Sequence, residues 1–108
     1  MRYEVLLTDA AARDLESIHA YISESDSPAS ADRILVEMSK VGERLETFPD
    51  RGSRPRELLA LGFVDFRQIV IKPWRVVYRI AAQRVFILLI ADGRRDMRTL
   101  LAQRLLGG

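Results

Sequence analysis

Three apolar segments in the second half of the chain are joined by very short links. The segments are DFRQIVI (residues 65–71), WRVVYRI (74–80) and VFILLI (85–90), and the links centre on Lys72-Pro73 and Ala82-Gln83. Links this short can join only antiparallel neighbours, so the pattern predicts three adjacent antiparallel strands. The third segment is apolar on both faces, and we therefore expect it to lie in the interior of the sheet.

The second of these segments is expected to present two chemically different faces, because successive side chains along a strand point to opposite sides of the sheet. Arginines on this strand are expected to lie at the rim or on the face away from the helices. The aromatic residues Phe66 and Trp74 are expected to pack in the core or at its rim rather than to stack on bases. The first face carries Trp74, Val76, Tyr78 and Ile80, and the second carries Arg75, Val77 and Arg79.

The first half of the chain predicts a strand over residues 3–8 and two amphipathic helices over 9–22 and 28–48. Ser27 fits an N-cap and Pro28 the first helical position, whereas Pro49 ends the second helix. Gly42 lies inside the second helix and suggests close approach to a neighbour. The apolar stripes follow helical spacing: Ala11, Leu15, Ile18 and Ile22 in the first helix, and Ile34, Met38, Val41, Leu45 and Phe48 in the second.

A short helix over residues 96–106 completes the predicted order of strand, helix, helix, three strands and helix. We expect one α+β domain spanning residues 1–108, with a helical hairpin packed on a small, largely antiparallel sheet as one pair of layers. The last two residues, Gly107 and Gly108, are expected to fray. Asp96 can cap the final helix, whose predicted buried side carries Met97, Leu100, Leu101 and Leu105.

The composition narrows the classes of protein that this chain can represent. It has no cysteine and one histidine, which excludes disulfides, cysteine–metal sites and multi-histidine sites. No metal or cofactor is therefore expected. The N-terminal residues lack the apolar run of a secretion signal, and the longest apolar run is too short to span a bilayer. We expect a cytoplasmic protein that does not associate with membranes.

Charge is distributed unevenly along the chain. Residues 1–50 contain five Lys/Arg and eleven Asp/Glu, whereas residues 51–108 contain twelve Lys/Arg and four Asp/Glu. This asymmetry predicts an acidic or polyanionic partner for the basic half, although the two halves could instead attract each other. Arg94, Arg95, Arg98 and Arg104 could also be ordinary solvated charges. The candidate binding residues are Arg67, Arg75, Arg79, Arg94, Arg95 and Arg98.

Three segments resemble the RelE/ParE superfamily of bacterial toxins from type II toxin–antitoxin systems. LTDAAARDLESIHAYI is similar to the first strand and alanine-rich helix of this superfamily. FPDRGSRPRELLALGFVDFRQIVI resembles its helix end, loop and second strand, and RVVYRIAAQRVFILLIADGRRDM resembles its central hairpin with an arginine-rich exit. The order and spacing of these segments cover nearly the whole chain. The resemblance implies a toxin that is neutralised by an antitoxin.

The superfamily contains two mechanisms, and the residues favour one of them. RelE-like members cleave mRNA on the ribosome, and the resemblance would assign Arg67, Arg75 and Arg95 to catalysis. RNA cleavage also needs an acid and a base, whereas a guanidinium stays protonated. The family's C-terminal tyrosine would fall near Leu101, and the second basic position near Ile69. The loop PDRGSRPREL resembles ParE-like members, which are not known to be hydrolytic and trap DNA gyrase on cleaved DNA.

The ParE-like interpretation implies two partners, a cognate ParD-like antitoxin and DNA gyrase. We expect a C-terminal segment of the antitoxin to cross the groove between hairpin and sheet, with its acidic residues meeting Arg75, Arg79, Arg94 and Arg95. The toxin alone has no recognition helix for sequence-specific DNA binding. His19 is expected on the outer surface of the first helix. Three alternatives remain open: a RelE-like endonuclease, a non-toxic antitoxin-binding module and a generic RNA-binding domain.

Overall fold

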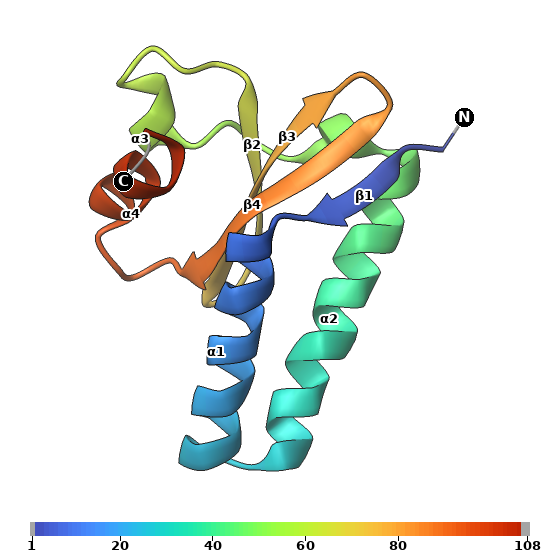
Figure 1. The fold of residues 1–108 in the computed structure, drawn as a ribbon, viewed down its shortest axis with the longest axis vertical. Helices are drawn as coiled ribbons and strands as arrows, with labels where there is room; N and C mark the ends of the chain where they lie inside the picture. Colours follow the sequence, from blue (N-terminus) through green and yellow to red (C-terminus); the bar gives the residue numbers. More distant parts are fainter. Residues whose placement is uncertain (1, 107–108) are drawn as a thin grey trace.

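The computed structural model describes residues 2–106 (Figure 1). The α+β order predicted from the sequence is confirmed, with a 3-10 turn (η1) and a short helix (α3) added between the hairpin and the sheet. The predicted fraying of Gly107 and Gly108 lies outside the described residues. The elements are β1 (Glu4–Leu7), α1 (Asp9–Ser25), α2 (Pro28–Thr47), η1 (Pro49–Arg51), α3 (Arg56–Leu59), β2 (Phe66–Ile71), β3 (Trp74–Ala81), β4 (Arg84–Asp92) and α4 (Met97–Leu105).

Side-chain caps set the starts of the three longer helices. The Thr8 hydroxyl accepts a hydrogen bond from the backbone of Ala11 at the start of α1. Ser27 caps α2 and is followed by Pro28 at the first helical position, as predicted. The carboxylate of Asp96 accepts from the backbone of Thr99 and caps α4, also as predicted. Helix α1 continues three residues beyond its predicted end.

The sheet has the strand order β1-β4-β3-β2 within the described residues. Strands β2, β3 and β4 pair antiparallel through the two predicted hairpins. Strand β1 pairs parallel with β4 because the two long helices separate β1 from the rest of the sheet in the chain. Strand β4 therefore lies between two neighbours, which confirms its predicted interior position.

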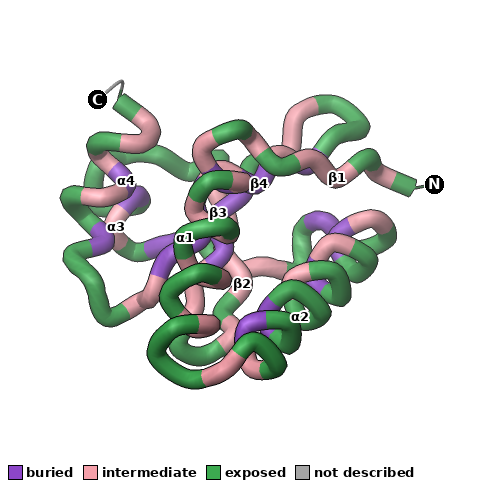
Figure 2. Tube along the Cα trace, turned by 60° about the horizontal axis from the view of Figure 1, so that its bottom comes forward, coloured by how far each residue is buried: buried purple, intermediate pink, exposed green. Residues whose placement is uncertain are grey.

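The helical hairpin covers one face of the sheet and forms the larger core. Side chains at Val76 and Tyr78 of β3 point to this face, which confirms the predicted alternation. Buried segments run along β3 and β4, and further ones lie on α2, α3 and α4 (Figure 2). The buried residues of this core are Ala11, Val41, Leu45, Val76, Tyr78, Val85, Ile87 and Ile90.

Helices α3 and α4 cover part of the opposite face, so the prediction of a single pair of layers was incomplete. Residues predicted as an irregular connection form α3, whose Leu58 is buried against the sheet. Figure 1 shows α3 beside α4, away from the hairpin. The second core consists of Leu58, Val77, Leu89, Ala91, Met97 and Leu101.

Three expectations about single residues were wrong. Phe48 is 64% exposed because α2 ends there with a non-helical backbone, and Pro49 is buried instead. Gly42 does not mark close approach, since a Cβ at that position would meet nothing within 4 Å. His19 does not lie on the outer side of α1: its Nε2 lies 3.0 Å from the Asp32 carboxylate on α2, which links the two helices.

Candidate functional site

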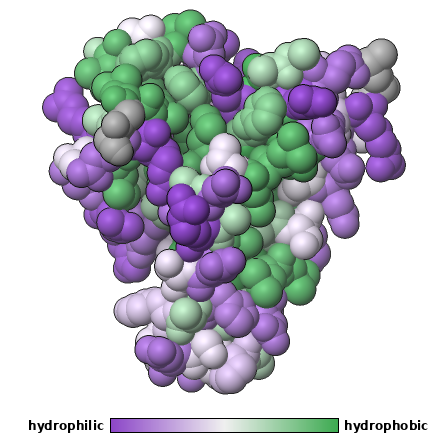
Figure 3. Space-filling model, in the orientation of Figure 1, coloured by the Kyte–Doolittle hydropathy of each residue, from purple (hydrophilic) through white to green (hydrophobic). Residues whose placement is uncertain are grey.

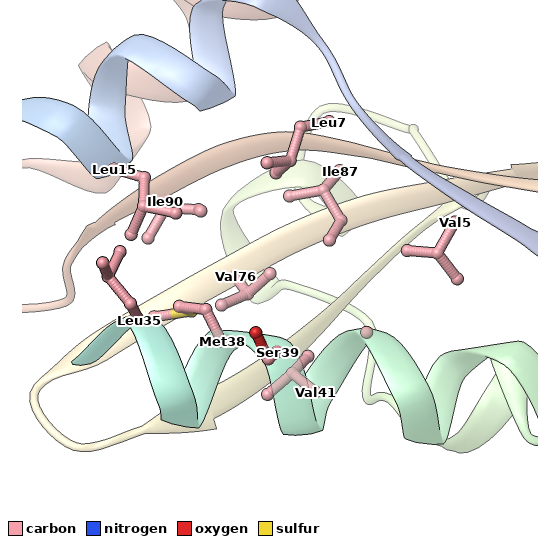
Figure 4. Close-up of a pocket in the computed structure, with 11 residues that line it drawn as sticks. Val5, Leu7, Leu15, Leu35, Met38, Ser39, Val41, Val76, Ile87 and Ile90 are labelled. Atoms are coloured by element: carbon pink, nitrogen blue, oxygen red, sulfur yellow. The ribbon is translucent and has the colours of Figure 1, made fainter. Parts of the chain in front are cut away.

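An apolar hollow of about 250 Å³ opens between the two long helices and the sheet (Figure 4). We call it the hairpin groove. Side chains from α1, α2, β1, β3 and β4 converge on it, and Ser39 is its only hydroxyl-bearing lining residue. The lining residues are Val5, Leu7, Leu15, Leu35, Met38, Ser39, Val41, Gly42, Val76, Ile87 and Ile90.

The hairpin groove remains open because of two features of its rim. Gly42 contributes no side chain, and the space over it is empty to 4 Å. Leu7 and Leu35 are large apolar residues that stay partly exposed at the opening. A neighbouring shallow hollow of about 410 Å³ shares Leu7, Leu15 and Leu35 with the groove. Exposed apolar surface of this kind is typical of an interaction site.

The arginine-rich exit of β4 borders a separate hollow of about 540 Å³ beside α1. Arg94 and Arg95 line it together with Tyr21, whose side chain is exposed. Arg94 donates from Nε to the Asp92 carboxylate at 3.0 Å, and these bonds lower the pKa of Asp92 to about 2. The pair is exposed, so water screens it and Arg94 remains accessible.

Arg75 is bound within the chain. Its guanidinium donates two hydrogen bonds of 2.8 Å to the Glu57 carboxylate, and its Nε donates to the Gln68 side chain at 2.7 Å. The hydrogen bonding of Arg75 to this carboxylate is the main reason why the pKa of Glu57 is lowered to about 2. Only 13% of the Arg75 side chain is exposed, and a Cβ on Gly93 would lie 2.9 Å from its Cδ. An external phosphate would have to displace Glu57.

Arg67 lies on the other face of the sheet from Arg75. It is paired across the strands with Tyr78, and its Nη1 donates to the carbonyls of Asp50 and Gly52. The buried Tyr78 hydroxyl donates to the Pro49 carbonyl at 2.6 Å and accepts from the Gly52 amide at 3.0 Å. Burial raises the pKa of Tyr78. This network ties η1 to the sheet.

The three residues that a ribonuclease would need do not converge. Arg67 and Arg75 point to opposite faces of the sheet, and Arg95 lies on the exposed turn after β4. Where the resemblance would require a tyrosine, the chain has Leu101, which is fully buried in the second core. The groups nearest Arg75 are acceptors, Glu57 and Gln68, and the pKa of Glu57 is too low for it to act as a base near neutral pH.

The remaining arginines differ in their surroundings. Arg79, Arg95 and Arg98 are exposed, and none has a side-chain hydrogen bond or ion pair to another residue in the range 2–106.

Arg104, which could have been a solvated helix charge, instead donates to the Asp14 carboxylate at 2.8 and 2.9 Å and to the Leu88 carbonyl. Asp14 also accepts from the Ile90 amide. No spacing in the sequence signals this pair, because 90 residues separate its members.

Across residues 2–106, no three His, Cys, Asp or Glu side chains are grouped closely enough to hold a metal ion. In the same range, no helix combines the length and apolar character needed to cross a bilayer.

The fold is that of toxins from type II toxin–antitoxin systems. A chain of the chromosomal ParDE system from P. aeruginosa superposes with a TM-score of 0.70 at 20% identity, covering 84% of this chain and 96% of that one. A chain of the toxin–antitoxin complex RelBE2 from Mycobacterium tuberculosis superposes with a TM-score of 0.63 at 24% identity, covering 85% and 99%. At these identities the likeness defines the fold alone.

Sequence comparison defines the branch. Residues 5–97 match the family described as ParE toxin of type II toxin–antitoxin system, parDE. Toxin ParE3 of Caulobacter vibrioides is 32% identical over 100 residues, which cover 93% of this chain and 96% of that relative. The chain belongs to the ParE toxin family and is the toxin component of a type II toxin–antitoxin system.

Proposed function

We propose that this toxin arrests bacterial growth by trapping DNA gyrase on cleaved DNA, and that it acts in the cytoplasm. Membership of the ParE family over residues 5–97 carries the proposal. The state of Arg75 supports it, because a guanidinium already bound by Glu57 and Gln68 is poorly placed to stabilise a phosphorane. A RelE-like ribonuclease would need Arg67, Arg75 and Arg95 to act together, and they lie apart.

A gyrase assay tests this proposal directly. Purified toxin free of antitoxin is incubated with gyrase, ATP and supercoiled plasmid, and the products are then treated with detergent and protease. We expect linear DNA to accumulate, and prior addition of the antitoxin to prevent it. Undisturbed supercoiling without linear DNA, from toxin that still binds its antitoxin, would exclude gyrase as the target. Cuts in A-site codons on programmed ribosomes would then favour the ribonuclease alternative.

The second part of the proposal concerns the antitoxin. A ParD-like antitoxin inserts apolar side chains of its C-terminal segment into the hairpin groove, where Gly42 leaves room for them. Its acidic residues meet Arg94 and Arg95 in the hollow beside α1, which shares Ile90 with the groove. Arg75 and Arg79 point to the opposite face of the sheet, so one segment in the groove would not meet all four arginines.

Substitution of Gly42 tests the placement of the antitoxin. Gly42→Leu adds a side chain into empty space, so the fold should persist while the groove is filled. We expect antitoxin affinity to fall by about tenfold or more, the usual effect of losing one buried anchor. Val36→Leu, on an exposed part of α2 outside the groove lining, serves as the matched control. Unchanged affinity in Gly42→Leu would move the antitoxin to another surface.

A further inference from the structure

The end of α3 and the loop that follows it, together called the loop below, display four apolar side chains to solvent in a fixed conformation. Leu59, Leu61, Phe63 and Val64 are between 37% and 56% exposed. Gly62 has a φ of +88°, and the backbone amides of Phe63 and Gly62 donate to the carbonyls of Leu58 and Leu59. This is the hydrogen-bond pattern with which a glycine ends a helix, so the loop is held by its own backbone.

The position of this loop makes its apolar surface continuous with that of α4. Figure 3 shows hydrophobic side chains gathered at the upper left, where Figure 1 places α3, the loop and α4. Phe63 also contacts Phe66 of β2 edge-to-face, with ring centroids 6.2 Å apart. Solitary exposed apolar residues are common, but a contiguous group on an ordered loop is typical of an interaction site.

Three arginines surround a pocket of about 360 Å³ that adjoins the apolar loop at Val64. Arg54 donates from Nε to the Val64 carbonyl at 2.9 Å, which joins the loop to the pocket. Arg67 is held by backbone carbonyls, and Arg79 is exposed. Asp65 is the one acidic residue in the lining, so the pocket carries a net positive charge.

These arginines differ from Arg75 and Arg104, which are neutralised by Glu57 and Asp14. Within residues 2–106, no carboxylate forms an ion pair with Arg54, Arg67 or Arg79. All three arginines line the same pocket, and an external carboxylate bound there would form charge-assisted hydrogen bonds with a guanidinium that has no acidic partner in the chain. The pocket therefore fits an external anion.

We propose that the exposed residues of the loop and of this pocket form one docking surface for the toxin's target protein. The surface consists of Leu59, Leu61, Phe63, Val64, Arg54 and Arg79, and its partner is an acidic segment that carries an apolar anchor. A protein fits better than a nucleic acid, because a phosphate backbone offers no apolar group to cover the exposed side chains of the loop. Aromatic residues and arginine are also the side chains that dominate the energy of protein interfaces.

The surface is separate from the proposed antitoxin site. Its pocket shares no lining residue with the hairpin groove. The loop also lies at the end of the molecule away from the turn between α1 and α2 (Figure 1). The assignment to a target rests on the proposed function as a growth-arresting toxin, but it does not require that target to be gyrase. Target binding and antitoxin binding should therefore be separable by substitution.

Two double variants test the docking surface in cells and with purified protein. Arg54→Glu/Arg79→Glu reverses the charge of the pocket, and Leu61→Asp/Val64→Asp makes the loop polar. All four residues are exposed, so both variants should fold. Arg33→Glu/Val36→Asp on the exposed side of α2 is the matched control. Thermal unfolding, antitoxin affinity and growth after induction without antitoxin are measured for each.

We expect wild type and the control to arrest growth, whereas both surface variants need about tenfold more toxin for the same arrest. Antitoxin affinity should stay within a few-fold of wild type. Surface variants that arrest growth like wild type would overturn the docking surface and leave the proposed function intact. Loss of antitoxin affinity in these variants would assign the surface to the antitoxin instead. A wild type that does not arrest growth would overturn both proposals.

One further measurement separates a protein partner from a nucleic acid. Binding of each purified toxin to a fluorescent DNA duplex is measured over a range of salt concentrations. We expect wild type and Arg54→Glu/Arg79→Glu to bind the duplex equally weakly. Salt-dependent binding by wild type that the charge reversal abolishes would overturn the protein-binding proposal in favour of a phosphate backbone.

Discussion

The two faces of the sheet carry similar apolar cores but are closed in different ways. On the hairpin face, α1 and α2 leave the groove over Val76, Ile87 and Ile90 open at Gly42. On the opposite face, the short helices α3 and α4 bury Leu58 and Leu101 completely, and Glu57 binds the Arg75 guanidinium at the edge of this core. The two long helices therefore leave apolar surface exposed for a partner. The short helices instead place polar groups, such as the Glu57 carboxylate, in contacts within the chain.

The arginines show what this difference means for function. The positions of nearby carboxylates decide whether an arginine is available to a partner. Arg75 and Arg104 each have a carboxylate within 2.8 Å, and both are partly shielded from solvent. Arg79 and Arg95 belong to the same basic half of the chain but remain exposed. The positive charge of residues 51–108 consequently overstates the number of arginines that are accessible.

The largest expected effect concerns the two cores. Leu45→Ala on the hairpin face and Leu101→Ala on the opposite face each remove a fully buried side chain. We expect each to lower the free energy of unfolding by about 3 kcal/mol, which is typical of such cavities. Urea unfolding followed by circular dichroism measures this loss. If Leu101→Ala left the free energy of unfolding unchanged, the layer of α3 and α4 would not belong to the part of the protein that unfolds cooperatively.

The next effect concerns the contact between η1 and the hairpin face. Tyr78→Phe removes the hydroxyl that binds the Pro49 carbonyl and the Gly52 amide. Because both backbone groups lose a buried partner, we expect a loss of about 2 kcal/mol in the free energy of unfolding. Thermal unfolding measures the change. Tyr21→Phe, which alters an exposed tyrosine, should have no comparable effect.

The pH dependence of stability tests the ion pair on the opposite face. The pKa of Glu57 falls from 4.5 to about 2 on folding, so its contribution is fully present above pH 4.5 and disappears as the pH falls towards 2. Glu57→Gln weakens a charge-assisted hydrogen bond, so we expect it to lower the free energy of unfolding by about 1 kcal/mol at neutral pH. Near pH 2, where Glu57 is losing its charge in wild type as well, the variant and wild type should be equally stable. Denaturant unfolding between these pH values measures the difference.

An exposed carboxylate provides the control for this ion pair. Glu43→Gln changes an exposed residue of α2 and should leave the pH profile close to that of wild type. A gap between Glu57→Gln and wild type that persisted unchanged at the acidic end would show that the effect is not caused by the charge of Glu57.

The smallest expected effect is a gain in stability at the open groove. Gly42→Ala adds a methyl group where nothing lies within 4 Å and should stabilise α2 by about 1 kcal/mol, because alanine favours a helix. The same change at Gly52 should destabilise the protein, since its Cβ would lie 2.6 Å from the Gln68 carbonyl oxygen. Thermal unfolding of the two variants gives the comparison. Destabilisation by Gly42→Ala would mean that the groove is closed in solution.

Most elements of the fold could be predicted from local sequence patterns. Helical spacing located α1 and α2, and short links located the two strand hairpins. The caps Ser27 and Asp96 were also predictable, because they depend on hydrogen bonds within three residues. Helix α3 was missed because its one short turn lies in a segment rich in turn residues, and its position depends on Leu58 finding the sheet.

The candidate sites were less predictable than the fold. The sequence supplied the arginines as candidates, but it did not show which of them have a carboxylate partner. Asp14 and Arg104 are 90 residues apart, and Glu57 reaches Arg75 only because α3 folds back over the sheet. The apolar segment LLALGFV is a sequence signal for this loop, but the sequence does not reveal that the loop is exposed.

By itself, the sequence determined the order of the helices and strands, their apolar faces and the toxin family, because periodicity, caps and motif spacing are properties of neighbouring residues. The tertiary structure decided which surfaces are available. Whether a groove stays open at Gly42, or an arginine is neutralised as Arg75 is, depends on side chains brought together from distant parts of the chain. A groove or a side chain is available to a partner only where those internal contacts leave it exposed.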